Sequence, residues 1–407
     1  MKKKSSGKVK ILVVCQYYYP EPFRITDICE ELVRRGHKVT VLTGLPNYPE
    51  GEIHPEYKFG KNRNETINGV QVKRVLEIPR GKSKAQLFLN YFSFALSGSI
   101  KSLNLKKDFD VIFVNQLSPV FMTIPAIVYK KVYNKKLFLY CLDLWPASLA
   151  SGGISQENSI YKIIKKISKW IYQSADGIAV TSKMFIRYFD QDLKVDTNKI
   201  SYLPQYAEDL FGEDNTNNKL NNDFNLVFAG NVGVMQSVET IVEAAKILKE
   251  NNKIIFHIVG DGTSLEGCKA LATLYELDNV IFYGRKPITD MPNYYNMADV
   301  MLLTLKKDDL ISYTLPGKVQ SYMAAGKPIV ASIDGEGQRL INEANCGYAS
   351  EAENPKLLAE NILKMSTDAK MDLLGINSLN YYRKEFNKQK FMDSLESELI
   401  LLGDSNV

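Results

Sequence analysis

The 407-residue chain has few of the residues that build metal centres and disulfide-bonded domains. It contains three histidines and no HExxH, HxxxH or DxD-like cluster, so we predict neither a structural nor a catalytic metal. Its five cysteines are scattered and form no CxxC pair, which favours reduced thiols in the core of a cytosolic protein. These cysteines are Cys15, Cys29, Cys141, Cys268 and Cys346.

Long apolar runs and repeats are also absent. No stretch reaches the roughly 18 apolar residues of a membrane-spanning helix. The apolar run that follows "MKKKSSGKVK" stops at Gln16, which is too short for the core of a signal peptide. Without a fixed-period repeat, solenoids and repeat arrays are not expected. The sequence therefore predicts a protein that is soluble or lies on a membrane surface.

Charge is divided unevenly along the chain. Residues 1–206 carry a net charge of +15 and residues 207–407 a net charge of −10. Halves of opposite sign are typical of two domains with different partners. The basic half suits an anionic membrane surface or a diphosphate-bearing acceptor, although lysines that are simply solvated would give the same count.

What the sequence does contain is an alternation of apolar strands and helical patterns. In the first half, strand-like runs at 9–15, 38–43, 70–76, 110–115, 136–142, 176–181 and 199–203 alternate with helical patterns at 24–36, 118–133 and 158–174. The alternation restarts at 225 after a polar stretch. We predict an α/β protein of two tandem Rossmann-like doubly wound domains with a cleft between them. The predicted parts are an N-terminal domain 1–206, a linker 207–223, a C-terminal domain 224–385 and a C-terminal helix 386–407 packing back on the N-terminal domain.

Residues 87–100, "LFLNYFSFALSGSI", are almost unbroken in apolar and aromatic character. One interpretation is a helix buried between the sheet and its neighbours. The other is a helix whose aromatic face rests on a membrane interface, since basic residues flank the segment. The sequence does not separate the two.

Glycine clusters follow two successive strands of the second half. "FAGNVG" contains Gly230 and Gly233, and "IVGDG" contains Gly260 and Gly262 ahead of a helical pattern. Glycine lets backbone N–H groups approach a phosphate closely, and the following helix N-terminus favours an anion. Strand-to-helix turns also need glycine for geometry alone, so the nucleotide interpretation rests on the pair of clusters.

Lys318 begins the helical pattern of "LPGKVQSYMAAGKP". A cation at a helix N-terminus is mildly unfavourable unless an anion lies between them. We therefore expect a donor diphosphate there, with Arg285 of "YGRKP" as a second cation. A solvent-facing lysine is the alternative.

Two loops of the first half are candidates for an acceptor site. "QYYYPEPFR" follows the first strand where a GxGxxG turn would stand, and it lacks those glycines. Its aromatic and polar side chains suit sugar rings, or they pack against their surroundings. "CLDLWPAS" places Asp143 and Trp145 after a buried strand, where the carboxylate could act as an acid/base group or simply cap the turn.

These segments resemble the two-domain GT-B glycosyltransferases of family 4. In the first half the resemblance rests on residues 11–53, 139–153 and 175–182, and in the second on 228–248, 257–262, 291–303 and 315–341. The combination of YxxPExxR, GLPNYPxG and DLWPxS is similar to bacterial capsule and O-antigen enzymes of the N-acetyl-L-fucosamine transferase type.

The resemblance implies a retaining, metal-independent transfer from a UDP-sugar to a polyprenyl-diphosphate-linked saccharide. The sugar would be an N-acetylated amino or deoxy sugar. The enzyme would work in the cytoplasm, peripherally on the inner face of the membrane, with no cofactor and no nucleic acid. The family's Glu-x7-Glu motif falls on Tyr313 and Ser321, and its Arg and Lys positions read Asn231 and Gln236.

The site residues are therefore assigned position by position. The expected catalytic residues are Asp143, Lys318 and Arg285. Donor binding is expected at Gly230, Asn231, Gly233, Gln236, Gly260, Asp261, Gly262, Gly317, Ser321 and Glu336. Acceptor binding is expected at Tyr17, Tyr18, Tyr19, Glu21, Arg24 and Trp145. The alternatives are a GT-B-fold sugar-nucleotide epimerase and a nucleotide-sugar-binding protein without catalysis.

Overall fold

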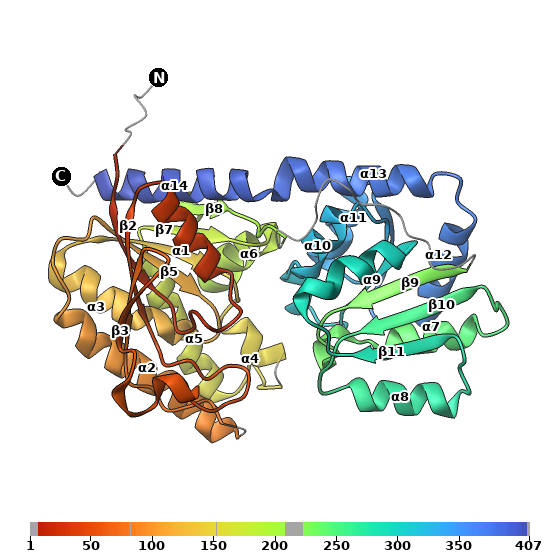
Figure 1. The fold of residues 1–407 in the computed structure, drawn as a ribbon, viewed down its shortest axis with the longest axis horizontal. Coiled ribbons are helices and arrows are strands. Elements are labelled where there is room, and N and C mark those ends of the chain that lie inside the picture. Colours follow the sequence, from red (N-terminus) through yellow and green to blue (C-terminus); the bar gives the residue numbers. More distant parts are fainter. Residues whose placement is uncertain (1–6, 82, 152, 208–222, 405–407) are drawn as a thin grey trace. The chain divides into compact units, whose positions relative to one another are not determined.

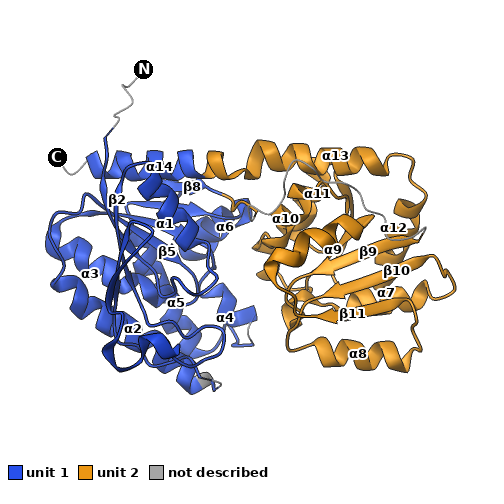
Figure 2. Cartoon of the chain, in the orientation of Figure 1, with its two compact units in different colours: residues 1–203, 392–407 blue, residues 204–391 orange. Residues whose placement is uncertain are grey.

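The computed structural model describes residues 7–81, 83–151, 153–207 and 223–404. The chain divides into two compact units, residues 1–203 with 392–407 and residues 204–391 (Figure 2). The predicted linker 207–223 lies, apart from its first and last residue, outside the described residues. No helix within the described ranges combines the length and apolarity that crossing a membrane requires.

Unit 1 is built on an eight-stranded sheet in the order β3-β4-β2-β1-β5-β6-β7-β8 (Figure 1). Its strands are β1 Lys10–Val14, β2 Lys38–Thr43, β3 Asn64–Ile67, β4 Val70–Arg74, β5 Val111–Gln116, β6 Lys136–Cys141, β7 Gly177–Val180 and β8 Ile200–Tyr202. Its helices are α1 Ile25–Arg34, α2 Lys84–Leu103, α3 Ile124–Tyr133, α4 Ala147–Ser151, α5 Ser159–Ser174 and α6 Lys183–Tyr188. The central strands β1 and β5 are buried almost throughout, as strands covered on both faces must be.

One strand of unit 1 departs from the expected parallel sheet. β3 pairs antiparallel with β4, and the two are joined by Asn68 and Gly69, which both have positive φ. An Asn-Gly pair is the usual central dipeptide of a tight hairpin turn. The signal was present in "TINGVQV", although only the second strand was predicted.

Unit 2 has a six-stranded, all-parallel sheet in the order β11-β10-β9-β12-β13-β14. Its strands are β9 Phe224–Ala229, β10 Ile254–Val259, β11 Val280–Gly284, β12 Val300–Thr304, β13 Ile329–Ser332 and β14 Gly347–Ser350. Its helices are α7 Glu239–Ile247, α8 Leu265–Leu274, α9 Met291–Met297, α10 Lys318–Ala324, α11 Gly335–Ala344, α12 Pro355–Ser366 and α13 Met371–Tyr381. Apolar clusters on the two faces of this sheet form the core, so the predicted doubly wound arrangement is confirmed.

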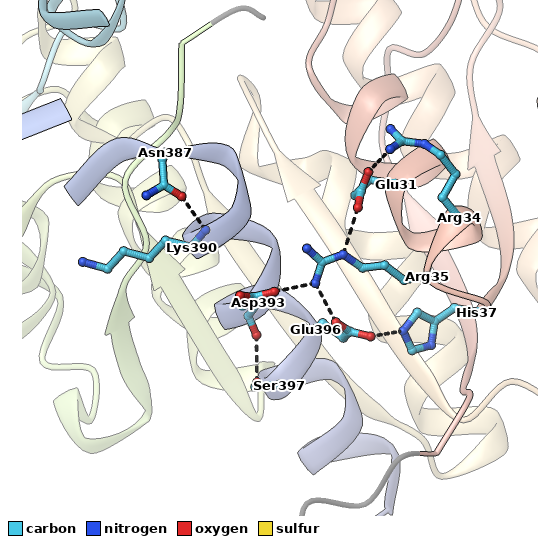
Figure 3. Close-up of polar contacts among 9 residues, drawn as sticks. All are labelled: Glu31, Arg34, Arg35, His37, Asn387, Lys390, Asp393, Glu396 and Ser397. Atoms are coloured by element: carbon cyan, nitrogen blue, oxygen red, sulfur yellow. Dashed lines mark hydrogen bonds and ion pairs between the residues drawn. The ribbon is translucent and has the colours of Figure 1, made fainter. Parts of the chain in front are cut away.

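The last helix, α14 Lys388–Asp404, crosses the unit boundary, and its residues from Met392 onward belong to unit 1. There Arg35 Nη1 lies 2.7 Å from both Asp393 Oδ1 and Glu396 Oε2 (Figure 3). Nδ1 of His37 accepts from the backbone N–H of Val9, so Nε2 carries the proton donated to Glu396. This contact fixes α14 to unit 1.

Candidate functional site

The carboxyl ends of β9 and β10 bring the two glycine clusters together in unit 2. The backbone N–H of Val232 donates to Asp261 O, and that of Ser264 donates to Val232 O, both at 2.9 Å. A Cβ on Gly260 would overlap Gly230 O, and both glycines have positive φ. Gly262, also at positive φ, meets Val232 O in the same way. Close packing of the two turns therefore accounts for Gly260 and Gly262 without any ligand.

Lys318 lies directly against this pair of turns. A Cβ built on Gly230 would be 3.1 Å from its Nζ, which also lies 3.8 Å from the centroid of the Phe228 ring. Nζ is buried and has no hydrogen-bond partner among the described residues. Burial lowers the pKa of the ammonium from 10.5 to about 7. An unpaired buried amine is costly, so this position is prepared for an anion rather than for solvent.

Asn231 and Gln236, the neutral residues at the family's Arg and Lys positions, lie beside the Gly230–Gly233 turn. Asn231 Nδ2 donates to Gln236 Oε1 at 2.8 Å, and a Cβ on Gly233 would meet both amide groups. Asn231 and Asp261 are exposed, and open space faces Gly317. These groups are accessible from the same edge of the sheet.

The other predicted donor residues are less accessible. Glu336 is fully buried and accepts from Arg339 Nη2 at 2.7 Å and from its Nε at 3.1 Å, so its carboxylate is already paired at the start of α11. Ser321 is buried within α10. Arg285, which was predicted as a catalytic cation, follows β11 at the edge of the sheet and, unlike these two residues, is exposed.

In unit 1, most of the predicted acceptor residues hold their own loop together. Tyr18 has no exposed surface, and its assignment to the acceptor is wrong for this structure because its ring is part of the core. Tyr17 is buried and stacks on Phe23 with ring centroids 5.2 Å apart. Tyr19 is 46% exposed, and Arg24 is half-buried. Only these last two predicted side chains of the loop present surface.

Glu21 has a positioning role that its motif did not reveal. Its carboxylate accepts from three backbone N–H groups, those of Tyr18, Asn47 and Tyr48, at 2.8–3.1 Å. Burial raises the pKa of the carboxyl to about 7, although the backbone donors oppose the shift. Glu21 therefore joins the loop after β1 to the loop after β2 and is not available to a sugar.

Sequence reasoning missed a buried polar cluster beneath these loops. Glu77 accepts from Gln16, Asn47 and Asn90, and its Oε2 has no partner among the described residues. Burial raises the pKa of Glu77 to about 8. A lone glutamate in the apolar run "VLEIP" was the available signal, because buried carboxylates are rare without partners.

Asp143 is also engaged. One carboxylate oxygen accepts from the Ser118 hydroxyl and the other from the Ser148 hydroxyl, and burial raises the pKa of the group. Trp145 is buried, and its indole N–H donates to Ser118 Oγ at 2.7 Å. The turn-capping interpretation thus describes what Asp143 does in this structure.

His257 has a structural role, and the five cysteines are thiols of the core, as expected for the cysteines. His257 is held between the Tyr283 hydroxyl and Asn225 Oδ1, and burial lowers its pKa to about 4. All five cysteines are buried free thiols. The described part of the chain brings no three His, Cys, Asp or Glu side chains together as metal ligands.

Comparisons with known proteins connect this geometry to a chemistry. The family model "Glycosyltransferase Family 4" matches residues 24–205, and the model "Glycosyl transferases group 1" matches residues 212–377. The chain is 26% identical over 249 residues to "Probable glycosyltransferase WbjE" of Pseudomonas aeruginosa, covering 58% of this chain but only 61% of that protein. It is 22% identical over 335 residues to WcaI of Escherichia coli (strain K12), which is named for colanic acid biosynthesis, covering 78% of this chain and 82% of that protein.

The fold is that of solved glycosyltransferases. The crystal structure of Anabaena Alr3699/HepE in complex with UDP superposes with a TM-score of 0.72 at 14% identity, covering 96% of this chain and 99% of that one. Together with the two sheets, one all-parallel and one parallel except for β3, this identifies the GT-B fold. The chain thus combines a Glycosyltransferase Family 4 domain with a Glycosyl transferases group 1 domain, and it is a glycosyltransferase.

Proposed function

We propose that the protein transfers a sugar, with retention, from a UDP-sugar to a polyprenyl-diphosphate-linked saccharide during synthesis of a surface polysaccharide such as capsule or O-antigen. The UDP donor is supported by the UDP complex of the structural neighbour HepE. The polysaccharide context is supported by the name of the relative WcaI. The motifs shared with enzymes of the N-acetyl-L-fucosamine transferase type favour an N-acetylated amino or deoxy sugar. A lipid-linked acceptor places the reaction at the inner face of the cytoplasmic membrane.

The observation that carries the proposal is the unpaired amine of Lys318. It is buried against the Gly230 turn at the carboxyl edge of the unit 2 sheet, where α/β proteins bind their ligands. A diphosphate beside Nζ would satisfy the amine and restore its full charge, because a nearby anion raises the pKa of an ammonium. The exposed guanidinium of Arg285 is proposed as a second, weaker contact.

In the proposed reaction, the bond between the anomeric carbon and the β-phosphate oxygen breaks as a bond to the acceptor oxygen forms. With retention, the acceptor approaches the face that UDP leaves, so the departing phosphate oxygen can take the acceptor proton. Lys318 stabilises the negative charge that develops on that oxygen. A well-placed donor of this kind contributes roughly 3 kcal/mol to the transition state. Asp143 is then a positioning group and not the base.

The test compares Lys318→Met with Lys253→Met, which removes an exposed lysine at the amino end of β10. With UDP-sugars and a polyprenyl-diphosphate saccharide as substrates, mass spectrometry should detect a new glycolipid. We expect Lys318→Met to lower kcat by roughly 10²–10³-fold, and Lys253→Met to leave it within about twofold.

Three outcomes contradict the proposal in different ways. Equal turnover of Lys318→Met and the wild type would remove the amine from the mechanism. An epimerised donor without glycolipid would identify an epimerase. UDP-sugar binding with neither product would identify a binding protein, as the missing Glu-x7-Glu motif allows.

A further inference from the structure

Helix α2 exposes a continuous apolar row along its length. The row consists of Phe88, Leu89, Phe92, Leu96, Ile100 and Leu103, each about half exposed or more. Residues three and four apart share one face of a helix, so these side chains form a single stripe. The opposite side of α2 packs inward through Asn90 and Phe94, which have no exposed surface. The interpretation of 87–100 as a helix buried between the sheet and its neighbours is therefore wrong for this face.

The apolar surface continues onto the segment that precedes α2. Leu76 is 69% exposed, and its carbonyl accepts from the Ser97 hydroxyl at 2.6 Å. The backbone N–H of Ile78, also exposed, donates to Ser93 Oγ at 2.9 Å. A mainly apolar groove of about 520 Å³, whose lining includes Leu76 and Tyr57, opens at the same segment. The exposed apolar area thus extends beyond one helix.

Charge on the neighbouring helices is of one sign. Helices α2, α3 and α5 contain eight lysines and no aspartate or glutamate. α2 packs against α3, and α3 against α5 (Figure 1). At their surface, Lys131 Nζ of α3 lies 5.4 Å from the ring centroid of Trp170 of α5. Among the lysines whose side chains are described, Lys130 pairs with Asp176, and Lys162 pairs with Glu157.

The other face of the same sheet has a different character. The crossover through α1 runs from β1 to β2, while those through α2, α3 and α5 run in the opposite direction across the sheet. Because parallel crossovers are right-handed, the two sets lie on opposite faces. α1 carries three acidic residues in ten, and α14 adds Asp393 and Glu396 beside it. The basic, acid-free composition is therefore particular to one face.

We propose that the face formed by the α2 row and the lysines of α3 and α5 docks on a lipid bilayer with anionic headgroups. Apolar and aromatic side chains beside lysines, on three helices that contain no acidic residue of their own, match the boundary between acyl chains and negative headgroups. This inference rests on the proposed function, since the acceptor is lipid-linked. It adds which face of which unit meets the membrane.

The test is sedimentation of the full-length protein with vesicles of equal parts phosphatidylcholine and phosphatidylglycerol. The double variant Phe88→Ser/Phe92→Ser should bind roughly tenfold or more weakly than wild type. Leu274→Ser, at a 72% exposed apolar residue of α8 in unit 2, should bind as wild type does. Because all three side chains are exposed, melting temperatures should stay close to that of wild type, which checks the fold.

Charge is tested separately with Lys131→Glu/Lys166→Glu, which reverses two exposed lysines of α3 and α5. This variant should lose roughly tenfold in affinity for the anionic vesicles, and phosphatidylcholine vesicles should bind every variant weakly. Three results would overturn the proposal. One is equal affinity of the wild type for anionic and for neutral vesicles. Another is wild-type affinity for anionic vesicles in both double variants. The third is dimers that form without vesicles and dissociate in Phe88→Ser/Phe92→Ser, since the row would then be an interface between copies.

A water-soluble, short-chain acceptor separates this inference from the proposed function. With that acceptor, the vesicle-binding variants should keep wild-type turnover. If a variant also loses turnover with this acceptor, its defect lies in catalysis or in folding. If it loses only vesicle binding, its defect lies in the docking face.

Discussion

Lys318 is held in a position that is unfavourable in the absence of a ligand. Its ammonium is buried, begins α10 and finds no hydrogen-bond acceptor among the described residues. The ring of Phe228 compensates only in part, since a cation over an aromatic face gains about 0.5–2 kcal/mol. A position of this kind costs stability in the free protein and is satisfied when an anion binds.

Because of this cost, we expect replacement of Lys318 to change the free energy of unfolding by an amount that depends on pH. Folding lowers the pKa of the amine from 10.5 to about 7, so the unfolded chain binds more protons between these values. Lys318→Met should therefore raise the free energy of unfolding by on the order of a few kcal/mol at or below pH 7, since each pKa unit is worth about 1.4 kcal/mol. The gain should shrink as the pH rises toward 10.5.

Urea denaturation at several pH values measures this gain. Lys253→Met, which removes an exposed amine, is the control and should change stability little at any pH. If Lys318→Met were destabilised at pH 7, the amine would have a partner in the free protein, and its proposed availability to a diphosphate would be wrong.

At the scale of elements, the contact between α1 and α14 is fixed by one of two adjacent arginines. Arg35 has a 14% exposed side chain and joins Glu31, Asp393 and Glu396. Arg34 is 61% exposed, and its partners Asp27 and Glu31 both belong to α1. The pKa of Glu396 is lowered from its usual 4.5. Burial alone would raise it, but the hydrogen bonds from Arg35 and His37 have the larger combined effect. The carboxylate therefore contributes stability above pH 4.5.

Replacing each arginine by alanine should separate the two roles. Arg35→Ala should lower the free energy of unfolding by about 2 kcal/mol, less than a fully buried pair would lose, because Asp393 and Glu396 are partly exposed. Arg34→Ala should change it by no more than about 0.5 kcal/mol. Chemical denaturation at pH 7 measures both. If the two variants lost equal free energy of unfolding, packing alone would hold α14. The difference between the two losses should become smaller below about pH 4.5, where acid protonates Glu396.

How much the sequence predicts also differs between elements. Buried parallel strands such as β1 and β5 were located to within a residue, because an unbroken apolar run is their own signature. The exposed face of α2 was not predicted. Its sequence is apolar on nearly every side, so the spacing of apolar residues does not indicate which face is buried. In the site, Lys318 and Gly230 were each predicted to serve the donor, and the structure brings the two residues together. The burial of Tyr18 and Glu21 depends on a loop whose partners lie tens of residues away.

For the whole molecule, the uneven charge acquires a structural meaning. Much of the excess in the basic half belongs to three helices on one face of unit 1, α2, α3 and α5, whose sequences contain eight lysines and no acidic residue. The acidic half contains the candidate donor site, where a single buried amine contacts the glycine turn. In unit 1 positive charge is thus distributed over the lysines of several helices, whereas in the donor site of unit 2 it is carried by the Lys318 amine. The first arrangement suits a headgroup layer and the second a diphosphate.

That arrangement leads to a prediction about the intact enzyme and metal ions. If Lys318 and Arg285 neutralise the leaving diphosphate, turnover needs no divalent cation to do so. Excess EDTA should leave the rate of glycolipid formation within about twofold, while Lys318→Met should remain slow with or without added Mg²⁺. A rate that collapses in EDTA and returns with Mg²⁺ would transfer the neutralising role to a metal. Recovery of Lys318→Met by Mg²⁺ alone would show that amine and metal can replace each other at the same phosphate.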